Sequence, residues 1–314
     1  MDQQLSALVE IGRSLRAAGY RFTAPTPATH AIVNARPENR VATSLTDVFG
    51  WSRPFYRNTL PAELLDRLER ADAIEVADNM LKSRVRFASL GDLLLVHSAY
   101  PTVDADSVFF GPDTYRFARL LRDEIAISRR DVTAGDRIVD IGCGTGAGGL
   151  SIGRGDGIEL ILTDINDRAL AYTKVNAELN GKSDATIGTS DILHGVEGPL
   201  DLVIANPPYM SDGPTYRDGG ALGIEIALHI VSQALEKLAP GGRLILYTGS
   251  PIVAGVDAFE DAVLPMLAGH DYTYEEIDPD LFGDELEKAP YARVDRIAAV
   301  ALSVTRSPSG KKAK

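Results

Sequence analysis

The sequence predicts an α/β protein: a doubly wound sheet of seven strands, preceded by a smaller N-terminal α+β domain. From residue 137 onward, short apolar runs alternate with helical patterns, which is typical of a largely parallel sheet. The 314 residues exceed one ordinary domain. Residues 1–104 hold 12 Lys and Arg and 12 Asp and Glu, whereas the remaining 210 residues hold 20 and 32. We therefore expect an N-terminal domain over 1–104, a second domain over 105–306 and a disordered polar tail over 307–314.

Composition excludes several classes of protein. The net charge of −12 argues against binding nucleic acid by bulk electrostatics, and the neutral N-terminal domain is the part better suited to meet a polyanion. The single cysteine, Cys143, excludes a disulfide framework, and the five histidines lack metal-ligand spacing, so no metal is expected. No apolar run approaches the roughly 18 residues that span a bilayer, and the N-terminus lacks a secretory signal layout. We expect a cytoplasmic protein that does not contact a membrane.

The N-terminal domain is predicted to combine helices with a hairpin. Apolar residues at helical spacing predict two amphipathic helices, over 3–18 and 61–71. Residues 80–100 are typical of two strands joined by a turn at 90–92. This order suggests a small α+β unit, winged-helix-like in one interpretation, that recognises the substrate. Arg84 and Arg86 would give the hairpin a binding edge, and the alternative is a solvated strand face.

A loop with two prolines joins the domains, and regular elements follow it. Phe110, Pro112, Asp113 and Thr114 lie in this loop, where Asp113 is predicted to cap a helix over 114–122. The predicted strands cover 137–141, 159–163, 185–188, 201–205, 242–248, 272–277 and 296–304. The predicted helices cover 146–153, 166–180, 223–238 and 256–268.

A glycine-rich turn follows the first strand of the second domain. The segment VDIGCGTG, residues 139–146, places three alternate glycines between a strand and a helix pattern. Glycine permits positive φ and lets a ligand approach the backbone closely. Ligands of such sheets bind beyond the carboxyl ends of the strands. The alternative is a tight strand–helix turn that binds nothing.

The next strand ends in an acid, Asp164, at the position where dinucleotide-binding folds hold ribose hydroxyls. The glycine pattern is GxGxG, however, and not the GxGxxG of pyrophosphate sites. Asp140, directly before the turn, would repel a pyrophosphate but suits a cationic ligand. These observations point away from NAD and towards S-adenosylmethionine, which carries a sulfonium.

With these residues, the sequence resembles the class I S-adenosylmethionine-dependent methyltransferases. VDIGCGTGAGG is similar to their first motif, and TDIN with the helix RALAYTKVNAELNG is similar to the next. The resemblance covers roughly residues 105–305. It implies a Rossmann-like methyltransferase sheet of strand order 3-2-1-4-5-7-6, with strand seven antiparallel, and S-adenosyl-L-methionine as the cofactor. The residues that it implies as cofactor contacts are Asp140, Gly142, Cys143, Gly144, Gly146, Asp164, Ile165, Ser190, Asp191, Ile192 and Asn206.

The fourth strand of the second domain leads directly into Asn206-Pro207-Pro208-Tyr209. The prolines stop regular structure and fix the backbone direction. The Asn206 carboxamide oxygen and the Pro207 carbonyl can both accept hydrogen bonds from one NH2 group, and a tyrosine ring can stack on a flat group. These parts suit methylation of an amide or exocyclic amine nitrogen, whose lone pair is delocalised. The alternative is a simple strand-ending turn.

The NPPY tetrapeptide resembles that of the amino-group N-methyltransferases, which include the release-factor glutamine methyltransferases, the small-domain ribosomal RNA methyltransferases and the adenine-N6 enzymes. The resemblance implies that Asn206 and Pro207 hold the target nitrogen, while Pro208 and Tyr209 complete the catalytic segment. The loop with Phe110 and Pro112 is similar to a substrate loop of the glutamine methyltransferases. Residues 282–292, between the last two strands, would border the substrate pocket.

We therefore expect an N-methyltransferase that acts on a protein glutamine side chain, with a translation factor as one candidate partner. A base of ribosomal RNA, transfer RNA or DNA is the alternative acceptor. The second alternative is a small-molecule methyltransferase or a protein that binds S-adenosylmethionine without catalysis.

Overall fold

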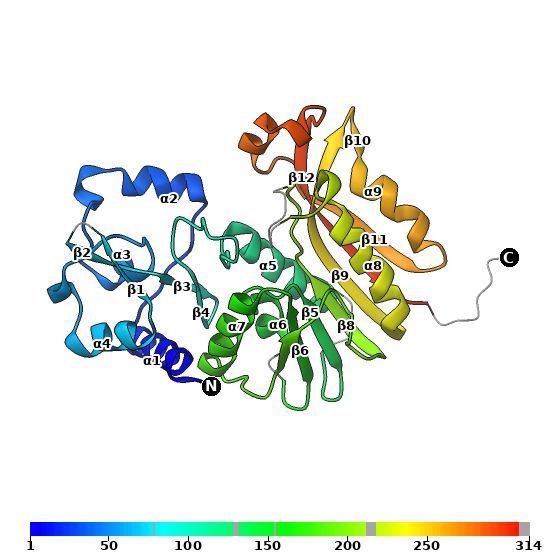
Figure 1. Ribbon diagram of the computed structural model, residues 1–314. Coiled ribbons are helices and arrows are strands. Elements are labelled where there is room, and N and C mark those ends of the chain that lie inside the picture. Colours follow the sequence, from blue (N-terminus) through cyan, green and yellow to red (C-terminus); the bar gives the residue numbers. More distant parts are fainter. Residues whose placement is uncertain (78, 128–131, 154, 212–217, 308–314) are drawn as a thin grey trace. The chain divides into compact units, whose positions relative to one another are not determined.

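The computed structural model describes residues 1–77, 79–127, 132–153, 155–211 and 218–307 (Figure 1). The chain divides into two compact units, which are described separately. The first comprises Met1–Arg116, Gly144–Ser151 and Asn166–Ile187, and the second comprises Phe117–Cys143, Ile152–Ile165 and Gly188–Lys314. The predicted tail lies outside the described residues from 308 onward. The predicted domain boundary at residue 104 stays a prediction.

Four helices begin the first unit: α1 (Gln3–Ala17), α2 (Pro27–Asn34), α3 (Leu45–Phe49) and α4 (Ala62–Arg70). α1 and α4 confirm the helices predicted from apolar spacing. α1 starts where the Asp2 carboxylate accepts the Leu5 N–H, and its apolar face is buried. α2 and α3 were not predicted, because they are too short to show an apolar period. Their side-chain caps are Thr26 and Ser44.

Two antiparallel strand pairs complete the N-terminal part of the first unit. They are β1 (Ile74–Ala77) with β2 (Met80–Ser83), and β3 (Val85–Leu90) with β4 (Leu93–Ser98). The predicted hairpin and its turn at 90–92 are confirmed for β3 and β4, but residues 80–83 pair with β1 instead. The predicted arginine edge is wrong for Arg86, which is only 3% exposed. Arg84 lies between β2 and β3, so the two arginines do not alternate along one strand. The winged-helix-like interpretation stays a prediction.

The sheet of the second unit has the predicted order. Its strands run β11-β12-β9-β8-β5-β6-β7, which is 3-2-1-4-5-7-6 in chain order of the second domain, and β10 pairs with β9 at the margin (Figure 1). β5 is parallel to β6 and β8, whereas β12 is antiparallel to β9. The bounds are β5 (Arg137–Ile141), β6 (Glu159–Asp164), β7 (Thr186–Thr189), β8 (Leu200–Ala205), β9 (Leu238–Val253), β10 (Val256–Asp257), β11 (Asp271–Asp278) and β12 (Arg296–Thr305).

The remaining helices follow the predicted pattern with two corrections. They are α5 (Pro112–Ile127), α6 (Ala147–Ile152), α7 (Asp167–Leu179), α8 (Glu225–Lys237) and α9 (Ala258–Val263). α5 begins at Pro112, so Asp113 lies in its first turn and not at its cap. The helix predicted over 256–268 divides into α9 and a 3-10 turn, Leu264–Leu267, since Pro265 lacks a backbone N–H. Other 3-10 turns are Pro37–Asn39, Arg57–Thr59, Ala221–Gly223, Gly283–Glu287 and Ala289–Tyr291.

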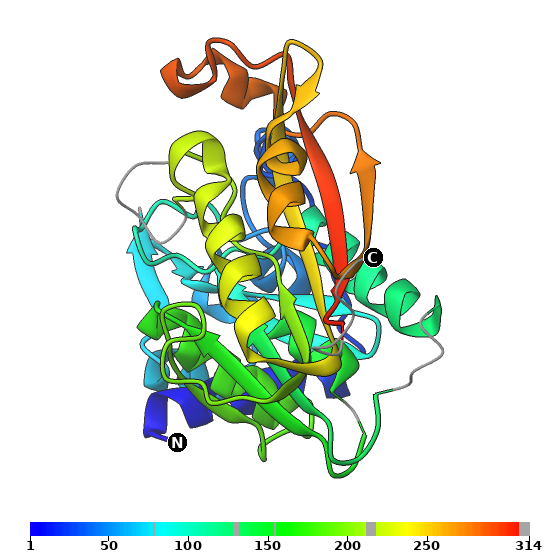
Figure 2. The same cartoon turned by 90° about the vertical axis from the view of Figure 1, so that its right-hand side faces the viewer.

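Residues of β9 alternate between two covered faces of the sheet. Leu244 and Leu246 belong to the apolar core formed with α8 and α9, which lie next to one another on this face (Figure 2). On the other face, Tyr247 meets the Phe117 ring of α5 at a centroid distance of 6.4 Å. Two covered faces explain why β8 and β9 are almost continuously apolar. No helix in the described ranges has both the length and the apolar character to cross a membrane.

Candidate active site

The turn after β5 keeps open space beside its backbone. Gly142 and Gly144 have φ of 60° and 56°, the left-handed region where other side chains are strained. A Cβ added at either position would meet no atom within 4 Å. Glycine is therefore needed here for backbone conformation and not for internal packing. The open space beside the turn permits a ligand to approach the peptide groups.

Two other members of the turn are fixed by their neighbours. The Cys143 N–H donates to the Thr163 carbonyl at 2.9 Å, which extends the ladder between β5 and β6 by one residue. Cys143 is 8% exposed and serves as a small packing residue. Gly146 is close to Thr173, whose Cγ2 would lie 3.1 Å from an added Cβ.

Asp140 and Asp164 lie on adjacent strands. Asp140 is 2% exposed on β5 and pairs in register with Leu162 of β6. Asp164 is the last residue of β6 and is half-buried. Ile165 follows it with 50% of its surface exposed, so a carboxylate and an exposed apolar side chain stand together at the strand end.

In the segment after β7, the side chain of Ser190 bonds to backbone carbonyls of the same segment. The Ser190 hydroxyl lies 3.0 Å from the Ile192 carbonyl and 2.7 Å from the His194 carbonyl, and its N–H donates to the Asp164 carbonyl at 3.3 Å. Ile192 is buried in the left-handed region with φ of 52°, and Asp191 is exposed. In this segment, Asp191 therefore holds the polar side chain that is open to a ligand.

Asn206 follows β8 directly, and its carboxamide has no hydrogen-bond partner in the described part of the chain. The side chain is half-buried, as are Pro208 and Tyr209, whereas Pro207 is buried. The polar atoms of Asn206 are not among the buried side-chain atoms of the described residues that lack a partner, so they reach solvent. Its oxygen and NH2 group at this strand end are thus available to a bound molecule.

Tyr209 has two aromatic neighbours and a glycine beneath it. Its ring centroid lies 6.4 Å from that of Tyr247 and 6.1 Å from that of Phe282. A Cβ added at Gly249 would lie 2.4 Å from Tyr209 Cδ2. Gly249 is not among the predicted site residues, because the strand was predicted to end at residue 248 and a glycine signals close approach of another group only inside a strand.

The chain that leaves the tetrapeptide is held by a tyrosine 80 residues away. The Ser211 N–H donates to the Tyr291 hydroxyl at 2.7 Å, and this hydroxyl donates to the Met210 sulfur at 3.6 Å. Tyr291 is 2% exposed. No local pattern could have paired Tyr291 with Ser211, because the contact depends on how β11 and β12 place their connecting loop.

The predicted substrate loop belongs to the first unit. Phe110 is fully buried, with its ring 5.2 Å from His97 and 5.3 Å from Tyr115. Asp113 is 6% exposed and pairs with Arg116 at 3.0 Å. Pro112 and Thr114 are half-buried. Phe110 and Asp113 are occupied by internal contacts, and substrate contact by this loop stays a prediction.

An asparagine of α7, Asn176, and the residue that caps this helix, Asn180, pair with the backbone of β4 in the first unit. Asn176 Oδ1 accepts the Val96 N–H at 2.7 Å, and its Nδ2 donates to the Val96 carbonyl at 3.1 Å. Asn180 does the same with Leu94, at 3.2 and 3.0 Å. Asn176 Nδ2 also donates to the Thr145 carbonyl at 2.9 Å. Through Asn176, α7 thereby holds Thr145, which is a residue of the glycine-rich turn after β5.

A buried basic cluster lies in the same unit. Arg86 donates to the Ser98 carbonyl at 3.1 Å and has no carboxylate partner within the described ranges, so burial lowers its pKa to about 10. Burial, together with nearby Arg86, lowers the pKa of His30 to about 4 against the opposing bond to Trp51. Burial also lowers the pKa of His97 well below its usual value.

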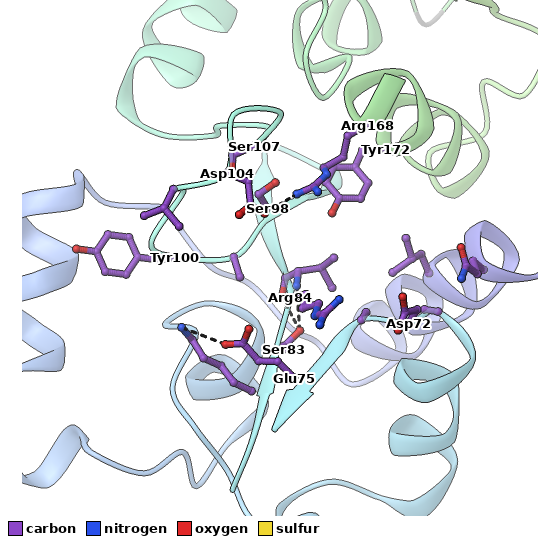
Figure 3. Close-up of a pocket in the computed structure, with 18 of the residues that line it drawn as sticks. Asp72, Glu75, Ser83, Arg84, Ser98, Tyr100, Asp104, Ser107, Arg168 and Tyr172 are labelled. Carbon is purple, nitrogen blue, oxygen red and sulfur yellow. Dashed lines mark hydrogen bonds and ion pairs between the residues drawn. The ribbon is translucent and has the colours of Figure 1, made fainter. Parts of the chain in front are cut away.

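A cavity of about 730 Å³ in the first unit is lined by none of the residues predicted for catalysis or cofactor binding, although Arg84 of the predicted binding edge lies in its wall. Figure 3 shows Arg84 near its centre, between Asp72 and Tyr100. Arg168 on its wall pairs with Asp104 at 3.1 Å. Elsewhere in the described residues, no group of three His, Cys, Asp or Glu side chains is arranged to hold a metal ion.

Comparison with known proteins supports the resemblance found in the motifs. Residues 119–253 match the family model of the methyltransferase small domain. A release factor glutamine methyltransferase of Deinococcus radiodurans is 30% identical over 161 residues, which cover 46% of this chain and 55% of that protein. A ribosomal RNA small subunit methyltransferase C of Chromohalobacter salexigens is 31% identical over 113 residues, which cover 36% of this chain and 31% of that protein.

A solved structure with a similar backbone is the T. thermophilus 16S rRNA N2 G1207 methyltransferase in complex with AdoMet and guanosine. It is 14% identical, has a TM-score of 0.45, and the match covers 82% of this chain and 64% of that one. The chain spans about half, or less, of the length of the curated relatives named above. The family match ends at residue 253, before Phe282 and Tyr291.

Proposed function

We propose that the chain is an S-adenosylmethionine-dependent N-methyltransferase that acts on a planar amide or amino nitrogen. The observation that carries the proposal is the carboxamide of Asn206, which lies without a hydrogen-bond partner in the described part of the chain, directly after β8. The match of residues 119–253 to a methyltransferase domain supports the reaction class.

The residues at the strand ends of the second unit fit the proposed cofactor. The peptide groups around Gly142 have open space beside them. A carboxylate at Asp164 would accept hydrogen bonds from ribose hydroxyls, and the exposed Ile165 side chain would pack against the flat adenine. Asp191 would accept a hydrogen bond from the adenine amino group. When bound, S-adenosylmethionine supplies a methyl group on a positively charged sulfur. Asp140 places a carboxyl group at the start of the glycine-rich turn after β5.

The tetrapeptide is suited to orient an NH2 group. Asn206 Oδ1 and the Pro207 carbonyl would each accept a hydrogen bond from one of its N–H groups, which withdraws the nitrogen lone pair from conjugation and directs it at the methyl group. Tyr209 would lie against the flat part of the acceptor. Most of the rate enhancement would come from this positioning.

A protein glutamine side chain is the acceptor that we favour. The net charge of −12 opposes binding of a phosphate backbone, and the Deinococcus relative is named for a protein acceptor. An RNA base is the second candidate, because the Chromohalobacter relative is named for ribosomal RNA and Arg84 is exposed in the first unit. The substrate-recognition role of residues 1–104 and the cytoplasmic location remain predictions.

Calorimetry tests the cofactor. The wild-type protein should bind S-adenosylmethionine, and Asp164→Ala should weaken binding by about 10- to 100-fold, the effect of losing charged hydrogen bonds. Asp167→Ala, which changes an acid in the first turn of α7, is the matched control. Absence of wild-type binding at millimolar ligand would refute the proposal.

A labelling experiment tests transfer and the acceptor together. Cell lysate is incubated with the protein and with S-adenosylmethionine carrying a radioactive methyl group, and the product is digested with protease or RNase. Label released by protease supports the protein acceptor, and label released by RNase rejects it. Asn206→Ala should abolish labelling while cofactor affinity stays near normal. An equally active variant would show that Asn206 does not have the assigned role.

A further inference from the structure

Resting on the proposed function, we infer that Tyr291 positions the segment that leaves the tetrapeptide and that Phe282 offers an aromatic surface to the flat acceptor group. Both residues lie in the loop between β11 and β12, residues 279–295. The family match ends at residue 253, so neither residue is part of the matched domain.

The loop is anchored at both of its ends. Leu281 is 6% exposed, and its N–H donates to the Ile297 carbonyl of β12 at 2.7 Å. At the other end, the Asp295 N–H donates to the Ile252 carbonyl of β9 at 2.8 Å, and Tyr291 is 2% exposed. Anchors on either side give Phe282 a defined place, because the chain cannot swing freely between them.

Tyr291 holds the chain immediately after Tyr209. Its hydroxyl accepts the Ser211 N–H at 2.7 Å and donates to the Met210 sulfur at 3.6 Å, so the one oxygen contacts two successive residues. The Gly219 N–H donates to the Met210 carbonyl at 2.7 Å from the other side. These bonds fix the exit of the tetrapeptide, and an error of about 1 Å in such a segment can lower a rate by about 100-fold.

Phe282 has a backbone conformation that its side chain does not favour. Its φ is 54°, in the left-handed region, where a bulky residue costs about 1–3 kcal/mol. Its side chain is nevertheless 37% exposed, so burial offsets this cost only in part. Strain that persists at an exposed aromatic residue is typical of a binding surface.

The direction in which Phe282 presents its ring is set by Tyr209. The two ring centroids are 6.1 Å apart with an angle of 44° between the planes, so the rings form an open wedge and not a closed stack. A flat amide or base that lies against Tyr209 would also meet Phe282. The pair would prefer flat acceptors over bulky aliphatic ones.

The charges next to Phe282 favour a protein acceptor. Asp284 and Glu287 are exposed and have no ion-pair partner within the described ranges. Two unpaired carboxylates close to an acceptor would repel the phosphates that flank a nucleic acid base. A glutamine side chain in a polypeptide brings no such charge. The inference therefore specifies a protein side-chain amide.

Two variants test the loop. Tyr291→Phe removes one hydroxyl oxygen and keeps the ring, and Tyr272→Phe on β11, where the side chain is 46% exposed, is its control. Phe282→Asn removes the ring but retains a residue that tolerates positive φ, and Leu264→Asn, also 37% exposed in the wild type, is its control. Calorimetry should give wild-type affinity for S-adenosylmethionine in all four.

Initial labelling rates are then measured over a dilution series of lysate. Tyr291→Phe should lower the maximal rate about tenfold, the value of one hydrogen bond of about 1.4 kcal/mol. Phe282→Asn should raise the half-saturating lysate concentration about three- to tenfold, with a smaller change in the maximal rate. Both controls should match the wild type, and protease should release the label.

Hydrogen exchange adds a measurement that needs no acceptor. The Ser211 amide should exchange at least about tenfold faster in Tyr291→Phe, because the partner of its N–H is gone. If the wild type neither binds cofactor nor labels lysate, the proposed function fails, and this inference fails with it. If the wild type labels lysate and both variants match it, or if RNase releases the label, this inference alone is overturned. Should Tyr291→Phe not fold, Phe282→Asn at the surface decides.

Discussion

The ring of Tyr209 fills the space that a side chain at position 249 would need. Gly249 lies inside β9, where it pairs with Ala299 of β12, and an added Cβ would be 2.4 Å from Tyr209 Cδ2. Real Cβ atoms do not come this close to another heavy atom, and the strand backbone at Gly249 is held by its ladder to β12. The tyrosine ring is therefore the part that must move when position 249 gains a side chain.

Gly249→Ala should impair methyl transfer without affecting the cofactor. Displacement of Tyr209 by about 1 Å should lower the maximal labelling rate by about 10- to 100-fold, whereas calorimetry should give an unchanged affinity for S-adenosylmethionine. Gly188→Ala is the matched control, because an added Cβ there meets nothing within 4 Å and its φ is not positive. Full labelling activity in Gly249→Ala would show that the position of Tyr209 does not limit transfer.

Asn176 should be important for the stability of the first unit. Asn176→Ala would leave the Val96 N–H and carbonyl and the Thr145 carbonyl without this partner in a buried site. We expect the free energy of unfolding to fall by at least about 3 kcal/mol, since each of the three unpaired buried groups costs about 1–3 kcal/mol.

Urea unfolding monitored by the fluorescence of the single tryptophan, Trp51, measures this loss in the unit that contains both residues. Asn39→Ala is the control, because the half-buried Asn39 amide makes one bond, to the Val33 carbonyl at 2.7 Å. A loss in Asn176→Ala no larger than in Asn39→Ala would mean that water replaces the lost bonds.

Much of the fold could be predicted because the apolar pattern of each strand is local. β5 matches its predicted range, and the other predicted strands, except that over 242–248, lie within one residue of their predicted ends, whereas β10 was not predicted because residues 256–257 were assigned to a helix. β9 extends beyond the predicted range of 242–248, because pairing with β8 and β12 sustains the strand through its glycines and prolines. The sheet order came from the family resemblance, since strand patterns alone contain no order.

Site residues could be predicted only where one short segment of the sequence contains both the functional side chain and the strand that places it. Gly142, Asp164 and Asn206 each follow a strand directly, so their place at the strand ends was predictable. The bond from Ser211 to Tyr291 joins residues 80 positions apart, and no local pattern indicates it. Burial of Arg86 was likewise unpredictable, because it depends on the break between β2 and β3.

Acid should destabilise the first unit through its buried histidines. Both ring nitrogens of His97 are buried without a hydrogen-bond partner in the described residues, and its pKa is held well below its usual value by burial. In the unfolded chain, His97 protonates near pH 6.5. Below that pH the unfolded state binds more protons than the folded state, so stability is complete above pH 6.5 and is lost as pH falls.

His97→Leu should both stabilise the protein and reduce this acid sensitivity. Leucine keeps an apolar contact with Phe110 and removes the unpaired nitrogens, which should raise the free energy of unfolding at pH 7.5 by about 1–2 kcal/mol. Between pH 7.5 and pH 5.5, the free energy of unfolding should fall by about 1.4 kcal/mol more in the wild type than in the variant. This difference is what one histidine contributes when it takes up a proton only in the unfolded chain. Urea unfolding at the two pH values measures both quantities, with the exposed His229→Leu as control. An identical pH dependence in wild type and His97→Leu would mean that His97 is already protonated in the folded state or gains water on acidification.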